Sequence, residues 1–169
     1  MLETGTSCAT TTSAGRLFDA VSSLIGVAHD AGYEGQAAIE LETLADDGRP
    51  IAPWPPHDLG VAPDGRLLVD GGALIAATVR DVLGGMQAGR VAARFHLSLS
   101  ESVLAVARRV RDERGVSTVG LTGGVFQNAV LTRLCAQQLS AFGFTVLVHR
   151  SVPANDGGIA LGQMMVGSP

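Results

Sequence analysis

The sequence predicts an α/β domain with a large helical share, and three observations lead to this prediction. Apolar residues recur at helical spacing in four segments of the first two thirds, namely 13–28, 33–45, 70–86 and 90–114. The last third alternates between predicted strands and helices, in the order strand 116–121, helix 127–142, strand 144–148, helix 157–166. A strand–helix–strand order favours at least one βαβ unit, so we expect a mixed, partly parallel sheet.

Local signals mark where elements begin and where the chain leaves regular structure. Ser13 and Asp70 stand directly before helical patterns, where a side-chain oxygen can cap the first turn. Residues 46–65 contain five prolines, which predict a loop or excursion within the domain. A short strand is expected to follow at 66–69.

Composition limits the partners and the location of the protein. The chain has 169 residues, 46% of them hydrophobic, which suits one domain or one half of a larger two-domain protein. The net charge of −4 argues against a nucleic-acid or anionic-membrane surface. No apolar run approaches the roughly 20 residues that span a bilayer, and the N-terminus lacks a secretory signal pattern. We therefore expect a cytoplasmic protein that binds neither membrane nor nucleic acid.

Cysteines, histidines and arginines give little sign of a site by themselves. The two cysteines, Cys8 and Cys135, form no CxxC pair, so neither a disulfide framework nor a cysteine zinc site is indicated. The four histidines show no metal-ligand spacing, and no catalytic base stands out. Arginines cluster near the end of helix 90–114, and we interpret them as a solvated helix end favoured by the helix dipole.

The stretch "LTGGVFQNAVLTRL", residues 121–134, places two glycines between a predicted strand and a helix. It lacks the Gly-Lys-Ser/Thr ending of a P-loop and is not a G-x-G-x-x-G fingerprint. Two interpretations remain level. Gly123 and Gly124 form an ordinary tight turn, or they let backbone N–H groups approach a phosphate.

Two carboxylates belong to the same set of open questions. In "VPANDGGIALGQ", residues 152–163, Asp156 stands where it would cap the next helix, and this is favoured over binding a divalent metal. Asp19 lies almost opposite Leu17 on helix 13–28, so a solvated surface role is the simpler interpretation. A carboxylate can also bind ribose hydroxyls, which leaves the role of Asp19 open.

Five segments taken in order resemble one known family. They are "GRLFDAVSSLIGV", "YEGQAAIELE", "RFH", "LTGGVFQNAVLTRL" and "HRSVPANDGGIALGQ". This series resembles the C-terminal portion of the HypF family of carbamoyltransferases, which help to mature nickel–iron hydrogenases. The resemblance extends to tRNA threonylcarbamoyl-transfer proteins and covers nearly the whole chain. It implies that residues 1–169 are the second half of an ATPase domain of the actin/sugar-kinase type.

The resemblance also implies roles for individual residues and a set of ligands. Gly123 and Gly124 would cradle nucleotide phosphates, Asn128 would contact the nucleotide, and Asp156 would hold a metal ion that binds phosphate. The nucleoside would be bound by Asp19, at the ribose, and by the segment around Gly35. The implied cofactors are ATP or carbamoyl-adenylate and a divalent metal, which would be iron, zinc or magnesium.

The implied reaction passes a carbamoyl group from carbamoyl-adenylate to a cysteine thiolate on a HypE-like acceptor protein. The family's metal-binding H-x-x-x-H element does not occur in this sequence. We therefore expect the chain to need a missing N-terminal lobe, in the same or a separate chain, and to be inactive alone. Two alternatives stay open: a non-catalytic scaffold that keeps the fold, and a sugar-kinase-like phosphotransferase.

Overall fold

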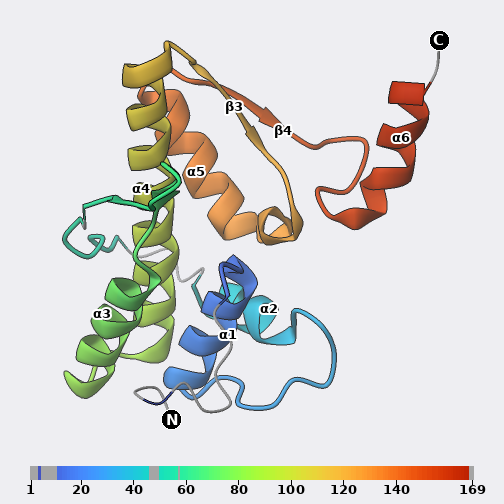
Figure 1. Cartoon of the computed structure of the whole chain (residues 1–169). Helices are drawn as coiled ribbons and strands as arrows, with labels where there is room; N and C mark the ends of the chain where they lie inside the picture. Colours follow the sequence, from blue (N-terminus) through green and yellow to red (C-terminus); the bar gives the residue numbers. More distant parts are fainter. Residues whose placement is uncertain (1–3, 5–10, 46–49, 57, 168–169) are drawn as a thin grey trace.

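A computed structural model describes residues 4, 11–45, 50–56 and 58–167, and Figure 1 shows how its helices and strands are arranged. Four helices come first, interrupted by a small hairpin. They are α1 (Ala14–Leu24), α2 (Gln36–Ala45), α3 (Gly71–Leu83) and α4 (Ala88–Arg114), with β1 (Gly60–Val61) and β2 (Leu67–Leu68) between α2 and α3. The last third contains β3 (Thr118–Leu121), η1 (Gly124–Gln127), α5 (Ala129–Ala141), β4 (Thr145–Val148), η2 (Asp156–Gly158) and α6 (Ile159–Gly167).

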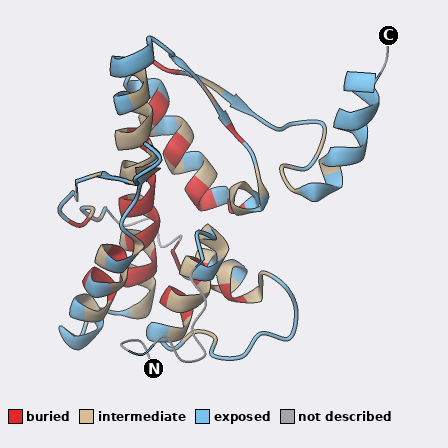
Figure 2. Cartoon of the chain, in the orientation of Figure 1, coloured by how far each residue is buried: buried red, intermediate tan, exposed pale blue. Residues whose placement is uncertain are grey.

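The 27-residue helix α4 is the central element, since α2, α3 and α5 all pack against it. Its buried stripe includes Val91, Phe95 and Leu99, at the helical spacing that the sequence predicts. Figure 2 shows buried residues running along α4 and along the side of α5 that faces it. The resulting core continues through Phe18 of α1 and Leu131 of α5, so one apolar cluster joins both parts of the chain.

The predicted parallel pair is confirmed. β3 and β4 pair in parallel, with Thr118 opposite Thr145 and Leu121 opposite Val148, and α5 makes the crossover between them. The expectation of a mixed sheet is wrong for the described residues. β1 and β2 form a separate antiparallel ribbon, so parallel and antiparallel pairs belong to two different sheets.

The predicted helices are present, and they end where backbone geometry requires. Ser13 and Asp70 cap α1 and α3, because their side chains accept the N–H groups of Arg16 and Ala73. Helix α1 ends at Leu24 rather than at residue 28, and Gly26 follows with φ +76°. The helix predicted from residue 33 begins only at Gln36.

The proline-rich segment is packed onto the helices. Residues 50–56 contain neither helix nor strand, and the two-residue β1 lies further along; residues 46–49 and 57 lie outside the described part. Trp54 is buried, its backbone N–H donates to Oγ of Ser98, and its Nε1–H donates to Asp81 at 2.8 Å. Prolines supply no N–H, so residues 50–56 are held against the helices by the side chain and the backbone N–H of Trp54.

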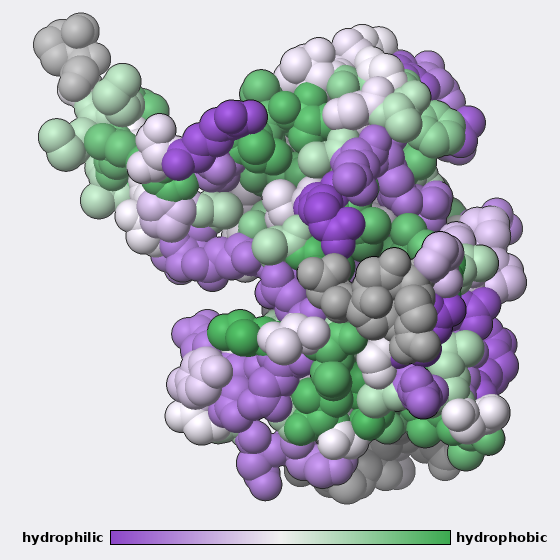
Figure 3. Space-filling view, turned by 180° about the vertical axis from the view of Figure 1, so that it is seen from behind, coloured by the Kyte–Doolittle hydropathy of each residue, from purple (hydrophilic) through white to green (hydrophobic). Residues whose placement is uncertain are grey.

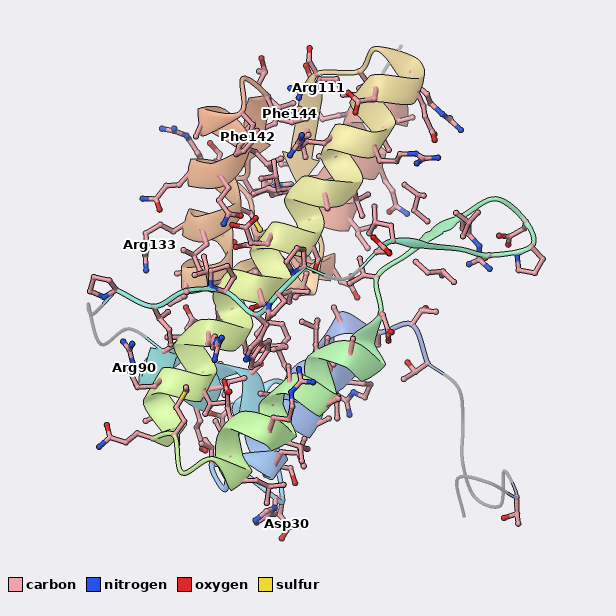
Figure 4. All side chains as sticks on the ribbon, turned by 90° about the vertical axis from the view of Figure 1, so that its left-hand side faces the viewer. Asp30, Arg90, Arg111, Arg133, Phe142 and Phe144 are labelled. Carbon is pink, nitrogen blue, oxygen red and sulfur yellow. The ribbon has the colours of Figure 1, made fainter. Side chains whose placement is uncertain are left out.

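The arginines at the end of α4 are not simply solvated, which corrects the interpretation from sequence. Arg111 donates from Nη1 to the carbonyl oxygen of Phe142 at 2.8 Å, and its guanidinium lies 4.3 Å from the ring centre of Phe144. Figure 4 shows Arg111 reaching from α4 toward these two residues, which lie in the connection between α5 and β4. Arg108 stacks over the ring of Phe142 in the same region.

Helix α6 stands apart from the other elements (Figure 1), and none of its described residues is buried. This nine-residue helix exposes mostly apolar side chains. Among the described residues, no helix combines the length and the apolar character needed to cross a membrane.

Candidate functional site

Two loops meet at the carboxyl ends of β3 and β4. Because the strands are parallel, both loops leave the same edge of the sheet, where ligands of open α/β folds bind. The backbone N–H of Gly123 donates to the carbonyl oxygen of Ala154 at 2.8 Å, and Oγ1 of Thr122 lies 2.9 Å from Nε2 of His149. A cavity of about 300 Å³ lies between the loops, bordered by Phe126, Gln127, Thr132, His149 and Pro153.

The first loop, residues 122–127, is called the diglycine loop below, and its two glycines differ. Gly123 has φ +96°, a conformation that other residues avoid, so its backbone requires glycine. Gly124 begins η1, and a Cβ atom placed on it would meet nothing within 4 Å. Steric need explains Gly123 and leaves Gly124 unexplained. The backbone N–H groups of Gly124 and Val125 donate no hydrogen bond to any group in the described part of the chain.

The N-terminus of α5 is already occupied by side chains of the protein. Oδ1 of Asn128 accepts the N–H of Leu131 at 2.8 Å, which makes Asn128 the N-cap. Oε1 of Glu42, on α2, accepts the N–H groups of Ala129 at 2.7 Å and Val130 at 3.4 Å. An anion at this edge would therefore meet the amides of the diglycine loop rather than those of α5.

Asn128 is buried, and its amide is held on both sides. Its residue surface is 7% exposed, and Nδ2 lies 3.0 Å from Nε2 of His96, which has no exposed surface. Burial lowers the pKa of His96 below its ordinary value, and a bond from Nδ1 to the carbonyl oxygen of Ala92 opposes this only in part. Sequence reasoning identified Asn128 but assigned no role to His96 beyond its place in "RFH".

Asp19 and Gly35 lie on elements beside the diglycine loop. Asp19 is on α1, which contacts η1, and Gly35 directly precedes α2, which contacts α5. The carboxylate of Asp19 pairs with Nη2 of Arg16 at 2.9 Å, and its side chain is 31% exposed. Gly35 has φ +82°, so the backbone here also favours glycine. The fold thus brings α1 against η1 and α2 against α5, which places both elements beside the loop.

Asp156 does not cap the helix that follows it, which corrects the expectation from sequence. The N-cap of η2 is Asn155, whose Oδ1 accepts the N–H of Gly157 at 3.1 Å. Asp156 is the first residue of η2 and is exposed, so its carboxylate is not used by the cap. Within the described ranges, no three histidine, cysteine, aspartate or glutamate side chains gather closely enough to hold a metal ion.

Comparisons with known proteins agree on one family. The family model described as "Carbamoyltransferase, Kae1-like Domain, second subdomain" matches residues 1–163. The chain is 39% identical over 156 residues to the carbamoyltransferase HypF of Rhodobacter capsulatus. It is 38% identical over 169 residues to a carbamoyltransferase HypF homolog of Cupriavidus necator. The matches cover 91% and 98% of this chain.

Solved structures give the same result. The chain is similar to a crystal structure of full-length HypF in the phosphate- and nucleotide-bound form, with a TM-score of 0.78 and 36% identity over 89% of this chain. It is also similar to T. kodakarensis HypF, with a TM-score of 0.74 and 28% identity over 92% of this chain.

The relatives are longer than this chain. The matched region is 19% of the Rhodobacter capsulatus protein, 43% of the Cupriavidus necator homolog and 23% of the full-length HypF chain. The protein belongs to the HypF family of carbamoyltransferases, in which it corresponds to the second subdomain of the Kae1-like domain.

Proposed function

We propose that this chain forms the nucleotide-binding half of a HypF-type carbamoyltransferase. The observation that carries the proposal is the diglycine loop, where the amides of Gly124 and Val125 have no partner among the described groups and Gly124 faces open space. Backbone N–H groups at such a turn bind phosphate oxygens well, because the donors are fixed and no side chain obstructs them. The similar full-length HypF was solved with phosphate and nucleotide bound, which supports the same ligand class here.

The remaining residues have roles that fit their positions. Asp19 would bind the ribose hydroxyls of ATP or carbamoyl-adenylate after releasing Arg16, an exposed pair that is worth little to stability. Gly35 would let the backbone before α2 approach the nucleoside. Asn128 has one N–H of its amide committed to His96, so any direct contact with nucleotide would use the other.

This chain would supply only part of a site for a divalent metal, whether iron, zinc or magnesium. Asp156 supplies one carboxylate that no capping bond uses, and the described residues provide no further cluster of ligands. The other ligands would come from the missing N-terminal lobe. Such an ion offsets phosphate charge when bound.

The exposed apolar surface of β4 and α6 fits a contact with the missing lobe. The family description names this part a second subdomain, and the relatives are two to five times longer. Figure 3 shows apolar residues gathered on the projecting α6. The exposed apolar surface of β4 and α6 consists of Leu147, Val148, Ile159, Leu161, Met164, Met165 and Val166. We propose that these apolar side chains pack against the first subdomain, because large exposed apolar surfaces mark interaction sites.

The complete enzyme would pass the carbamoyl group from carbamoyl-adenylate to a cysteine thiolate of a HypE-like acceptor. In that reaction this chain would bind and orient the nucleotide part and would be inactive by itself. The alternative is a non-catalytic scaffold that keeps the fold. In a scaffold, Asp19 and Asp156 could change without loss of partner binding.

A calorimetric titration of the folded chain with ATP and Mg²⁺ tests the proposal. We expect binding that weakens by about tenfold in Asp19→Ala, as for the loss of hydrogen bonds to a charged group. Glu113→Ala is the matched control, since it also removes an exposed ion pair within a helix, with Arg109. If the wild-type chain binds no ATP, or if the two variants behave alike, the nucleotide half-site is wrong and the scaffold alternative stands.

A further inference from the structure

A line of hydrogen-bonding groups runs from the N-terminal third of α4 to the first turn of α5. Nδ1 of His96 lies 2.8 Å from the carbonyl oxygen of Ala92, and its Nε2 lies 3.0 Å from Nδ2 of Asn128. Oδ1 of Asn128 accepts the backbone N–H of Leu131 at 2.8 Å. We propose that His96 is a positioning residue: it fixes the Asn128 amide and, through it, the diglycine loop on which the proposed nucleotide binding rests.

The two ends of the line determine the direction of every bond in it. The carbonyl oxygen of Ala92 can only accept, so Nδ1 of His96 carries the proton. The N–H of Leu131 can only donate, so Asn128 turns Oδ1 toward it and presents Nδ2 to His96. Nε2 of His96 is therefore the unprotonated acceptor, and the ring is the neutral Nδ1–H tautomer. A proton on Nε2 would face an N–H donor and break the line.

The surroundings leave these groups no substitute partner. His96 has no exposed surface, and its ring packs edge to face against Phe18 and Phe95, with centroid distances of 5.3 and 5.7 Å. Water does not reach Nε2, so the amide of Asn128 is the group that satisfies it. The rings also restrict rotation of the imidazole, which holds Nε2 toward α5. Burial lowers the pKa of His96, and this keeps the acceptor form populated.

Asn128 anchors the far end of the diglycine loop. Its backbone N–H donates to the carbonyl oxygen of Val125 at 3.2 Å, and its own carbonyl oxygen accepts from Thr132 N at 3.0 Å. The near end of the loop is anchored by the bond from Gly123 to Ala154. The unpartnered amides of Gly124 and Val125 lie between these two anchors. Loss of the His96 acceptor would leave the Asn128 side chain without its bond to α4 and so loosen this anchor, and fixed donors are what make such a loop bind anions tightly.

Two substitutions separate positioning from simple filling of space. In His96→Gln, the side-chain oxygen can accept from Asn128 at about the place of Nε2, so the line can form again. In His96→Leu, the volume is kept roughly but no acceptor remains. Ser100→Ala is the matched control, because Ser100 is also fully buried on α4 and its hydroxyl donates to the carbonyl oxygen of Leu97, on the same helix.

The first measurement is ¹⁵N NMR of the whole chain, labelled at histidine and asparagine. We expect His96 to show the neutral Nδ1–H tautomer and the Asn128 side-chain N–H to be protected from exchange, in both wild type and Ser100→Ala. His96→Leu should abolish that protection and speed exchange of the hydrogen-bonded backbone amides of Phe126 and Asn128 by tenfold or more, about the loss of one hydrogen bond. A protonated Nε2, or unchanged exchange in His96→Leu, would overturn the positioning role, whether or not nucleotide binds.

The second measurement is titration with ATP and Mg²⁺. His96→Leu should weaken binding by about tenfold, and His96→Gln should recover most of it. If wild type binds ATP and His96→Leu binds equally well, positioning for the ligand is wrong while the proposed function stands. If wild type fails to bind, the proposed function fails, and the exchange rates above still decide whether His96 holds the loop.

Discussion

Glu42 and Ala129 are 87 residues apart in the sequence, yet Oε1 of Glu42 accepts the backbone N–H of Ala129 at 2.7 Å. This contact places a carboxylate of α2 at the positive end of the α5 dipole, directly beside the diglycine loop. The protein thus fills the helix N-terminus with its own anion. The amides of Gly124 and Val125 remain without partners in the described part of the chain.

Removing the Glu42 carboxylate should destabilise the protein. In Glu42→Ala, two backbone N–H groups of α5 lose a charged acceptor, and we expect a loss of about 1–2 kcal/mol. The midpoint temperature of thermal unfolding should fall by about 3–6 °C for a chain of this size. Glu40→Ala is the control, since among the described residues the Glu40 carboxylate accepts a bond only from Gln36 on its own helix. An equal fall in both variants would contradict the capping role.

The two glycines of the diglycine loop should respond differently to substitution. Gly123→Ala forces a side chain into φ +96° and should cost about 1–2 kcal/mol of stability. Gly124→Val places its side chain in open space, so stability should change by less than about 0.5 kcal/mol. The same side chain should obstruct phosphate, so affinity for ATP and Mg²⁺ should fall. Denaturant unfolding and calorimetry check the two effects, and unchanged ATP affinity in Gly124→Val would exclude the loop as a phosphate site.

The sequence was most informative where a feature depends on adjacent residues. The strand–Gly-Gly–helix junction, the Asp70 cap and the β3–α5–β4 crossover all follow from short-range patterns, and each is present. The roles of Glu42 and His96 could not be predicted in this way, because both residues are far in sequence from the α5 terminus that they contact. Asp156 and Asn155 show the limit even at short range. Both residues can cap, and only the backbone path decides that Asn155 does.

Cys135 should be unreactive in the folded protein. It has no exposed surface, and burial raises the pKa of its thiol to about 12, so almost no thiolate forms near neutral pH. We expect a thiol reagent at about pH 8 to modify it only as fast as the protein opens, and rapidly in denaturant. The test uses Cys8→Ser as background, because Cys8 lies outside the described residues. Rapid labelling of the native variant would contradict the buried position.

Arg111 should contribute more to stability than its neighbour Arg109. Arg111→Ala loses the bond to the carbonyl oxygen of Phe142 and the stacking on Phe144, and we expect a loss of about 1–2 kcal/mol. Within the described part of the chain, Arg109 pairs only with Glu113 of the same helix, so Arg109→Ala should cost about 0.5 kcal/mol or less. Urea unfolding measures both variants. Similar losses of stability in the two variants would show that the contacts of Arg111 with Phe142 and Phe144 do not stabilise the protein.

The buried, neutral His96 should make the protein less stable as the solution becomes acidic. Its pKa is lowered in the folded state by burial, so the unfolded chain binds the proton more readily. The stabilising contribution is therefore complete above about pH 6.5, the unfolded value, and is lost as pH falls toward the lowered folded value. Urea unfolding between about pH 7 and pH 5 should show this decline in wild type and a flatter profile in His96→Gln. A slope in His96→Gln that matches the wild-type slope would contradict the assignment.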